Sequence, residues 1–485
     1  MASRGETDKT KTLSKMPLVI EPYRSSPPDR YCRLFRRNLR EVGDGTIETL
    51  GHLAFSMMMD ESPLPKACWH PQPPVAGYTY FGQFIDHDLT EDDTAIRDAG
   101  EREPWETVNY RGPWLNLSGI YDPAHDRGRW KSLYQDDGVR FRLGEPRRST
   151  NGEEFDLPLD DEGLPVLIDD RNNENIIIRQ IHVIFLKLHN IAIEEVRADY
   201  PFMPDRELFA NAQDRVCWQY QYLVRHDFLA KVCKPSVFDE LVTRNGTPTV
   251  DWRKGFSIPV EVAQAAFRFG HSMVRPSYTL SVSSGAVPLD KLLRSGRPGP
   301  LRPADEVHWP SFLTTGEFAM RIDTGIASPL FGLESKDIHS YVDTPSPHLP
   351  HALPVRTLVR GAKSRLPTGQ DVASKFGLTP IQAGPQKCNG VSYDPGKYLR
   401  DLGLGEAIPL WYYILLEAEI DDDGHGAYLG ELGSRLLIET INGALREDPA
   451  SYLSRFGPGW RPLPWKRTGR VVTTLAELAK LVGLF

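Results

Sequence analysis

The chain has 485 residues, of which 40% are hydrophobic and 25% are charged, and its formal net charge is −8. These proportions are ordinary for a globular protein, and the negative charge argues against nucleic acid or an anionic membrane as a partner. No Ser/Gly-rich linker or block of charge divides the sequence. We therefore expect a flexible N-terminal tail over residues 1–29 and one domain over residues 30–485.

Targeting signals are not visible. Residues 1–16 are polar and charged and hold no apolar stretch long enough for a secretory signal. The longest apolar run, residues 408–416, is far shorter than the ~20 residues that a membrane span needs. The 5 cysteines are widely spaced and form no CxxC motif, which favours free thiols in a reducing compartment. We expect a cytoplasmic protein without a membrane span.

In chain order, the apolar residues recur at helical spacing in several segments separated by Pro- and Gly-rich stretches. The predicted helices span residues 47–59, 78–89, 175–196, 208–232, 260–273, 408–420 and 429–446. The stretches 97–170 and 285–375 are rich in Pro, Gly and charge, and we expect long loops wrapped on the helical core. The predicted fold class is mainly α, with little β structure.

A polar motif lies on the predicted helix 78–89. Gln83, Asp86 and His87 are spaced i, i+3 and i+4, so they share one face, while Asp88 points about 100° away. A solvated surface helix would explain the polar face. However, neighbours such as Phe84 make the segment too apolar for full exposure, and buried polar groups require polar partners. The motif therefore indicates a polar face inside the protein.

A second motif, Arg171 to Glu174, opens the long helix predicted over residues 175–196. Glu174 has a structural explanation, because acidic residues are favoured at a helix N-terminus, where Asp169 and Asp170 also fit as capping residues. Arg171 has no such explanation, because a cation is unfavourable there. It indicates that something anionic faces this end of the helix.

The third motif places one histidine, His271, among apolar residues of the predicted helix 260–273. A lone histidine in this setting is more often a hydrogen-bonded core residue than a ligand. The preceding Gly270 would let a flat group approach the backbone, but it would equally serve close packing.

Taken in order, these motifs resemble the animal-type haem peroxidases of the peroxidase–cyclooxygenase superfamily and are most similar to its bacterial members. The resemblance covers most of the chain, from residue 30 to residue 455. The stretches that carry it are Gly82–Asp88, Asp170–Asn175, Gln180–Asn190, Phe267–His271, Leu358–Gln370 and Pro409–Glu419. It implies a single-domain helical haem peroxidase fold that binds haem b.

The resemblance also implies roles for the polar residues. His271 would be the proximal ligand of the haem iron, and His87 the distal histidine. Arg171 would be the distal arginine and Gln83 a hydrogen-bonding partner beside it. These three distal residues are the predicted catalytic groups.

Further residues match the cofactor-binding positions of the family. Asp86 and Glu174 match carboxylates that can form ester bonds to haem. Arg268 and Arg360 match arginines near the haem propionates, which a guanidinium can bind bidentately. Thr357 stands where the family has an asparagine that hydrogen-bonds the proximal histidine.

The resemblance extends to a calcium loop at residues 111–118. Oxygen ligands for a hard cation are available from the side chains of Asp88, Asn116 and Ser118 and from the carbonyls of Gly112 and Trp114. The family usually has Thr or Ser at position 112 and Asp at position 116. With Gly112 and Asn116 we expect a weak calcium site, and a plain loop is the alternative.

The predicted reaction is the reduction of hydrogen peroxide with oxidation of a small organic or halide donor, through a ferryl intermediate, in the response to oxidative stress. Haem held by one histidine leaves the other face open to peroxide, where a neutral imidazole can move a proton between the two oxygens. A fatty-acid dioxygenase or cyclooxygenase is the first alternative, but its tyrosine three residues before the proximal histidine is replaced by Arg268. A non-enzymatic haem-binding protein is the second, although it would need none of the distal groups.

Overall fold

The computed structural model describes most of the chain beyond the N-terminal tail. The described residues are 29–35, 44–92, 103–121, 130–149, 152–154, 156–251, 255–281, 285–293, 301–302, 305–333 and 351–485. Residues 1–28 of the predicted flexible tail lie outside this set, and Asp29 belongs to the first strand.

The described residues are mainly helical, as predicted. The longer helices are α1 (Asp44–Ser56), α2 (Gly77–Leu89), α5 (Ile176–Asp199), α6 (Asp205–Leu223), α12 (Leu353–Lys363), α13 (Gly369–Lys375), α15 (Leu410–Ile420), α16 (Glu431–Glu447) and α18 (Leu475–Leu481). The shorter helices are α3 (Ser118–Tyr121), α4 (Trp130–Leu133), α7 (Leu229–Val232), α8 (Pro235–Phe238), α9 (Val260–Ala263), α10 (Leu289–Leu292), α11 (Trp309–Leu313), α14 (Lys397–Asp401) and α17 (Tyr452–Phe456).

Strands contribute little to the described part of the chain. They form antiparallel pairs only: β1 (Asp29–Arg30) with β2 (Val108–Asn109), β3 (Arg147–Ser149) with β4 (Gly152–Glu154), β5 (Ser277–Tyr278) with β6 (Val287–Pro288), and β7 (Gln386–Cys388) with β8 (Val391–Tyr393). Each of these strands has only two or three residues, so the core is built by helix packing.

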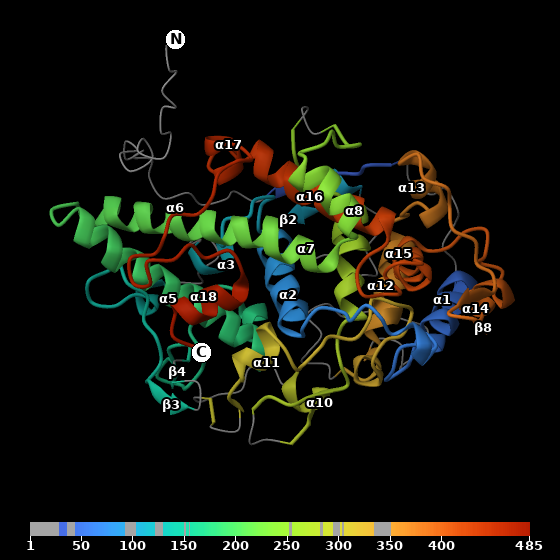
Figure 1. Cartoon of the computed structure of the whole chain (residues 1–485), viewed down its shortest axis with the longest axis horizontal. Helices are drawn as coiled ribbons and strands as arrows, with labels where there is room; N and C mark the ends of the chain where they lie inside the picture. Colours follow the sequence, from blue (N-terminus) through green and yellow to red (C-terminus); the bar gives the residue numbers. More distant parts are fainter. Residues whose placement is uncertain are drawn as a thin grey trace, which may run out of the picture.

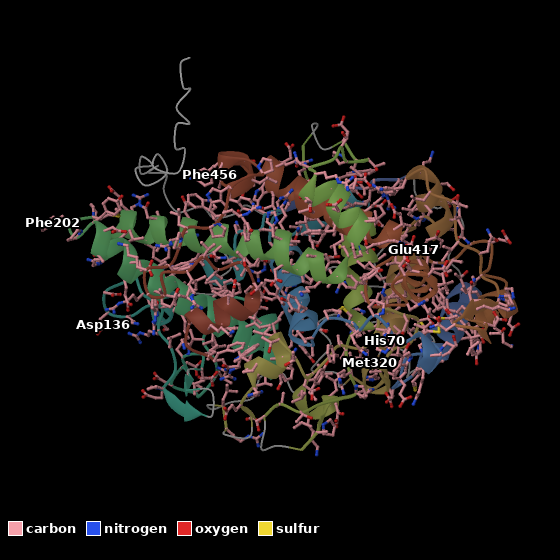
Figure 2. All side chains as sticks on the ribbon, in the orientation of Figure 1. His70, Asp136, Phe202, Met320, Glu417 and Phe456 are labelled. Atoms are coloured by element: carbon pink, nitrogen blue, oxygen red, sulfur yellow. A yellow bond between two sulfur atoms is a disulfide. The ribbon has the colours of Figure 1, made fainter. Side chains whose placement is uncertain are left out.

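The helices form two groups with α2 between them (Figure 1). α5 and α6 pack side by side in one half, and α1, α12, α13, α14 and α15 gather in the other. Figure 2 labels Phe202, in the connection between α5 and α6 at one end of the molecule, and Glu417, on α15 in the other half. α2 contacts α5 on one side and the 3₁₀ helix Ala266–His271 on the other. The polar face of α2 is therefore held at the centre of the molecule.

α5 shows how the local sequence sets the helix boundaries. The Asn175 side chain accepts hydrogen bonds from the backbone N–H groups of Ile177 and Ile178, which caps the first turn. The helix ends before Pro201, whose ring disfavours helical backbone in the residue before it. By length and composition α5 is apolar enough to cross a membrane, but 89% of its most apolar window is buried inside the fold.

The predicted helices are found, with two differences. The helix predicted over residues 208–232 contains a π-helical turn at Val224–Phe228 between α6 and α7. The prediction of one helix over residues 260–273 was wrong. α9 ends at Ala263, the backbone leaves helical geometry at Ala265, and a 3₁₀ helix follows. This break reorients the segment that carries His271.

The prediction that residues 285–375 form loops was also wrong in part. α12 and α13 lie within this range, and α12 starts with Pro354 in its first turn, where the missing N–H costs nothing. α12 packs against α1 and α15 and brings its arginines toward the centre of the molecule.

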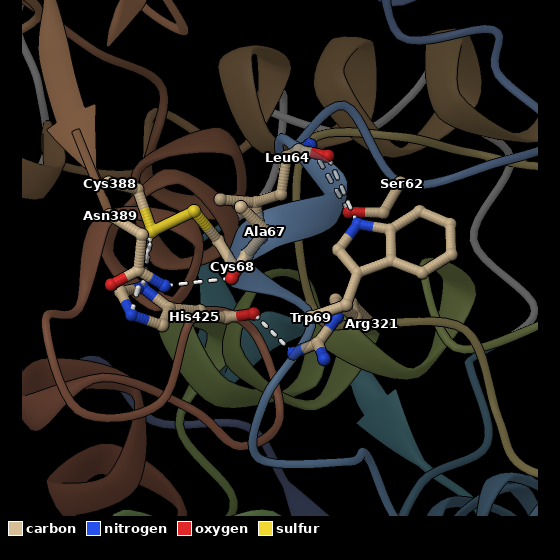
Figure 3. Close-up of a disulfide and its surroundings, with 9 residues drawn as sticks. All are labelled: Ser62, Leu64, Ala67, Cys68, Trp69, Arg321, Cys388, Asn389 and His425. Carbon is tan, nitrogen blue, oxygen red and sulfur yellow. Dashed lines mark hydrogen bonds between the residues drawn. A yellow bond between two sulfur atoms is a disulfide. The ribbon is translucent and has the colours of Figure 1, made fainter. Parts of the chain in front are cut away.

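The prediction of five free thiols was wrong. Cys68 and Cys388 form a buried disulfide between the segment that precedes α2 and strand β7, across 320 residues of sequence (Figure 3). The imidazole of His425 lies against the Cys388 sulfur, at 3.6 Å from Nε2. Cys32, Cys217 and Cys233 are free. The cysteines therefore no longer support a reducing compartment, which was one of the grounds for expecting a cytoplasmic protein.

Candidate active site

A cavity of about 320 Å³ lies between α2, the N-terminal end of α5, the 3₁₀ helix Ala266–His271 and α12. Seven of the nine residues predicted to act in catalysis or to bind haem line it. They are Gln83, Asp86 and His87 from α2, Arg171 and Glu174 from the segment before α5, and Arg268 and His271 from the 3₁₀ helix. The i, i+3, i+4 spacing on α2 thus does bring three polar side chains to one face.

His87 is held by a chain of side-chain hydrogen bonds on the distal side of the cavity. Its Nδ1 lies 3.0 Å from Asn172 Oδ1, and Asn172 Nδ2 lies 3.2 Å from His182 Nδ1. An amide oxygen can only accept, so Nδ1 of His87 carries the proton and Nε2 of the neutral ring is left without one. Sequence reasoning missed both partners, although Asn172 lies inside the motif that begins at Arg171.

The imidazole of His87 is held in its neutral form. Burial lowers the pKa of His87, and the nearby Arg171 guanidinium lowers it further. Burial also lowers the pKa of His182 to about 4, which keeps that ring neutral and able to accept the amide N–H of Asn172. Both rings can therefore keep their hydrogen-bonding roles at neutral pH.

Arg171 is fixed by the residue two positions before it. Its Nε donates to Asp169 Oδ1 at 3.0 Å and its Nη2 to Asp169 Oδ2 at 2.8 Å, while Nη2 also donates to the carbonyl of His87 at 2.8 Å. Arg111 pairs with the same carboxylate at 3.1 Å. Burial alone would raise the pKa of Asp169, but the two guanidiniums outweigh it and hold this pKa well below its usual value. Asp169 caps the 3₁₀ helix Asp170–Asn173 and also positions Arg171, whereas the long helix that it was expected to cap is capped by Asn175.

The predicted carboxylates occupy different surroundings. Glu174 Oε2 accepts a hydrogen bond from Gln83 Nε2 at 3.0 Å, and Asn175 Nδ2 donates to Gln83 Oε1 at 3.1 Å. Asp86 lies 3.6 Å from Arg268 Nη1. One carboxylate therefore sits in an amide network and the other beside a cation, and both reach the cavity.

His271 lines the same cavity from the 3₁₀ helix, and we call this side the proximal wall and the α2 side the distal wall. Burial lowers the pKa of His271 to about 3, with a further contribution from Arg268 and Arg356, so the ring is neutral. Its Nδ1 is buried and has no hydrogen-bond partner among the described residues. The Trp411 ring lies 5.9 Å from the His271 ring, and its indole N–H donates to the carbonyl of Arg268.

Two predicted site residues do not line this cavity. The Thr357 hydroxyl donates to the Leu353 carbonyl within α12, so the expected hydrogen bond to His271 is not formed. Arg360 pairs with Asp92 at 3.1 Å. Arg356, one turn earlier on α12, lines the cavity instead and was missed, because residues 285–375 were expected to be loops.

The residues around the cavity fit a haem. Gly270 faces it with no atom within 4 Å of the place where a Cβ would lie, which leaves room for a flat group against the backbone. Arg268, Arg356 and Arg360 are close enough to affect one another, and burial together with these like charges lowers the pKa of Arg356 to about 10. Such a cluster suits an anionic partner, and haem propionates are anionic. The neutral imidazole of His271 is the form that ligates iron.

The predicted calcium loop closes on Asp88 through hydrogen-bond donors. The Ser118 N–H and the Leu117 N–H donate to Asp88 Oδ1 and Oδ2, at 2.7 Å and 3.1 Å. Burial raises the pKa of Asp88 to about 6. Among the described residues, no group of three or more His, Cys, Asp and Glu side chains is placed to hold a metal ion. Calcium binding by Asp88, Asn116 and the rest of the loop stays a prediction that this geometry does not support.

Comparison with known proteins agrees with the resemblance. The family model for the animal haem peroxidase matches residues 92–295, which contain Arg171, Glu174, Arg268 and His271. The chain is therefore similar to the animal haem peroxidases over this stretch, which is less than half of its length. The match starts after α2, so it does not cover His87, which the structure brings into the same cavity as His271.

Individual relatives are distant. A peroxidase-like protein of Margaritifera margaritifera is 30% identical over 135 residues, which are 26% of this chain and 16% of that protein. The solved peroxidase A of Dictyostelium discoideum has a TM-score of 0.60 at 15% identity and covers 95% of this chain and 93% of its own. A fatty acid alpha-dioxygenase of Arabidopsis thaliana has a TM-score of 0.59 at 13% identity and covers 88% of this chain and 74% of its own. The fold is thus shared by proteins with two different reactions.

Proposed function

We propose that this protein is a haem peroxidase that reduces hydrogen peroxide and oxidises a small donor. The observation that carries the proposal is the neutral His87 ring, whose Nδ1 is bonded to Asn172 Oδ1, in the cavity that His271 also lines. A protein that only stores or carries haem needs no such fixed base.

Haem, when bound, would supply the iron that binds peroxide and would pass the two oxidising equivalents of peroxide on to the donor. The chain's own residues would do the rest. His271 would hold the iron on the proximal side. His87 Nε2 would accept the proton from the inner peroxide oxygen and return it to the outer oxygen, so that water can leave. Arg171 would stabilise the negative charge that develops on the separating oxygen.

The dioxygenase alternative has less support from this site. The position three residues before His271 is Arg268, whose guanidinium lies 3.6 Å from Asp86 and whose Nε donates to the Ala263 carbonyl. Fatty-acid dioxygenases and cyclooxygenases are expected to use a tyrosyl radical formed at this position. An arginine cannot form such a radical. We therefore favour peroxide as the oxidant.

Covalent attachment of haem is a second part of the proposal. Asp86 and Glu174 both reach the cavity, where carboxylates can meet the edge of a flat ring. Ester bonds would leave haem in the protein after extraction with acidified organic solvent. Extraction of all haem from peroxide-treated protein would contradict the ester bonds without affecting the proposed reaction.

The function is tested by loading the protein with hemin and mixing it with hydrogen peroxide in a stopped-flow spectrometer. We expect a Soret band and a fast, peroxide-dependent change in it. His87→Ala should slow this change by ~10²–10⁴-fold while the Soret band remains. His52→Ala, an exposed histidine on α1, is the matched control and should react as the wild type. A wild-type rate in His87→Ala would refute the proposal.

A further inference from the structure

The loop of residues 111–118 presents hydrogen-bond donors to Asp88, whereas a calcium ion would need oxygen ligands there. The N–H groups of Leu117 and Ser118 and the Ser118 hydroxyl all lie within 3.2 Å of the Asp88 carboxylate oxygens. Leu117 has a left-handed backbone, with a φ of 57°, at the turn that brings these two consecutive N–H groups to one carboxylate. Successive backbone N–H groups in such turns bind anions. The loop is therefore closed by donors around a carboxylate, and both oxygens of Asp88 are engaged.

The cation of this loop is the guanidinium of Arg111. Its side chain is 2% exposed, its Nε lies 2.7 Å from Glu91 Oε2, and its Nη2 lies 3.1 Å from Asp169 Oδ2. Glu91 follows α2, and Asp169 precedes the 3₁₀ helix Asp170–Asn173. One buried cation thus joins carboxylates from the two segments that supply the distal residues, which is the task that a structural calcium ion would otherwise perform.

Arg111 acts on the distal wall through Asp169. Oδ2 of Asp169 pairs with Nη2 of Arg111 at 3.1 Å and with Nη2 of Arg171 at 2.8 Å. The two guanidiniums hold the same carboxylate, so the loss of one would leave the position of Asp169 less fixed. The end of the loop packs on the same segment, because a Cβ at Gly119 would lie 3.2 Å from Asp169 Cβ and 3.3 Å from Asn172 Nδ2. The loop therefore bears on both supports of the distal wall.

We infer that the guanidinium of Arg111, and no calcium ion, is the cation that holds the distal wall together, and that it positions Arg171 through Asp169. Arg111 does not line the cavity, so it is a positioning residue. Of the side chains expected to bind calcium, only Asp88 is charged, and its oxygens already accept three hydrogen bonds. Calcium affinity follows the charge of the ligands, so the loop offers this ion little. The effect on catalysis rests on the proposed function, whereas the absence of a calcium requirement does not.

The calcium requirement is tested on the haem-loaded wild type without peroxide. Thermal unfolding is followed in excess EDTA and in ~1 mM calcium chloride, a concentration that fills even weak protein calcium sites. We expect the same unfolding midpoint in both solutions, and no saturable heat when calcium is titrated in a calorimeter. A higher midpoint or saturable binding with calcium that is lost in Asp88→Asn, but kept in the exposed control Asp136→Asn, would overturn the inference.

The positioning role is tested by the rate of reaction with peroxide in a stopped-flow spectrometer. Arg111→Met should slow the reaction about tenfold, the effect of one charged hydrogen bond, and keep the Soret band. Arg111→Lys retains the charge and should recover part of the rate. Arg197→Met removes an exposed arginine that pairs with Asp205, and this control should react as the wild type.

A double-mutant cycle separates positioning from a general loss of stability. If Arg111 acts through Arg171, Arg111→Met should cause no further loss of rate in an Arg171→Met background. A further tenfold loss in that background, or a wild-type rate in the single variant Arg111→Met, would overturn the inference. A calcium-independent midpoint without any fast peroxide reaction in the wild type would instead refute the proposed function and leave Arg111 as the cation of the loop.

Discussion

The two walls of the candidate active site are built in opposite ways. On the distal wall, His87 is tied through Asn172 to His182, and Arg171 is tied to Asp169. On the proximal wall, Nδ1 of His271 is buried without a hydrogen-bond partner among the described residues. The distal side fixes which nitrogen carries the proton, and the proximal side leaves this open.

This difference follows from what each wall would have to do. A base that moves protons must keep one nitrogen free of a proton, so its second nitrogen needs a fixed partner. A ligand is oriented by the iron itself, and a partner on the second nitrogen mainly tunes its basicity. The comparison therefore predicts a distal histidine that depends on its neighbours and a proximal histidine that depends on its metal.

The largest expected effect is the loss of haem in His271→Ala. Removal of the iron ligand should weaken the binding of added hemin by more than the ~10–100-fold that loss of a supporting hydrogen bond costs. Titration of the haem-free protein, before any exposure to peroxide, measures this, and added imidazole should restore part of the Soret band. His87→Ala is the paired variant and should keep wild-type affinity for hemin. Equal affinities in the two variants would contradict the assignment of His271 as the iron ligand.

The distal wall was also the one that sequence reasoning could predict. Helical spacing on α2 is local, so it places Gln83, Asp86 and His87 on one face whatever the rest of the chain does. Capping by an aspartate before the long helix was also expected from local sequence, although Asp169 caps the preceding 3₁₀ helix and Asn175 caps α5.

The proximal wall depends on features that are not local. The apolar pattern of residues 260–273 is compatible with both an α-helix and a 3₁₀ helix, so it could not reveal the break at Ala265. The role of Arg356 depends on α12, which lies in a Pro- and Gly-rich stretch. The disulfide between Cys68 and Cys388 joins residues 320 positions apart, and sequence alone cannot pair cysteines.

A smaller effect is expected when the distal histidine loses its acceptor in Asn172→Leu. Without Asn172 Oδ1, a larger share of His87 rings would carry the proton on Nε2 and be unable to accept one. We expect the rate of reaction with peroxide at pH 7 to fall about tenfold, the equivalent of one hydrogen bond of roughly 1.4 kcal/mol. Stopped-flow measurement at neutral pH gives this rate directly, and an unchanged rate would mean that the chain to His182 has no role.

The pH dependence of the same reaction gives a second readout. Because burial lowers the pKa of His87, the wild-type rate should rise with pH through an inflection below 6.5 and be flat at pH 7. Asn172→Leu removes a hydrogen bond that stabilises the charged ring, so its inflection should move to lower pH. Asn172→Asp keeps an acceptor and adds a negative charge, which should move the inflection to higher pH.

The smallest effect is expected on the proximal wall, in Thr357→Val. The Thr357 hydroxyl is bonded to the Leu353 carbonyl and not to His271, so the substitution removes no partner from the imidazole. The reduction potential of the bound haem should then stay within about 18 mV of the wild type. A shift of this size corresponds to a twofold change in the ratio of the protein's affinities for ferric and ferrous haem. Spectroelectrochemical titration measures this potential. A larger shift would mean that Thr357 supports His271 once haem is bound, and the two walls would then be built alike.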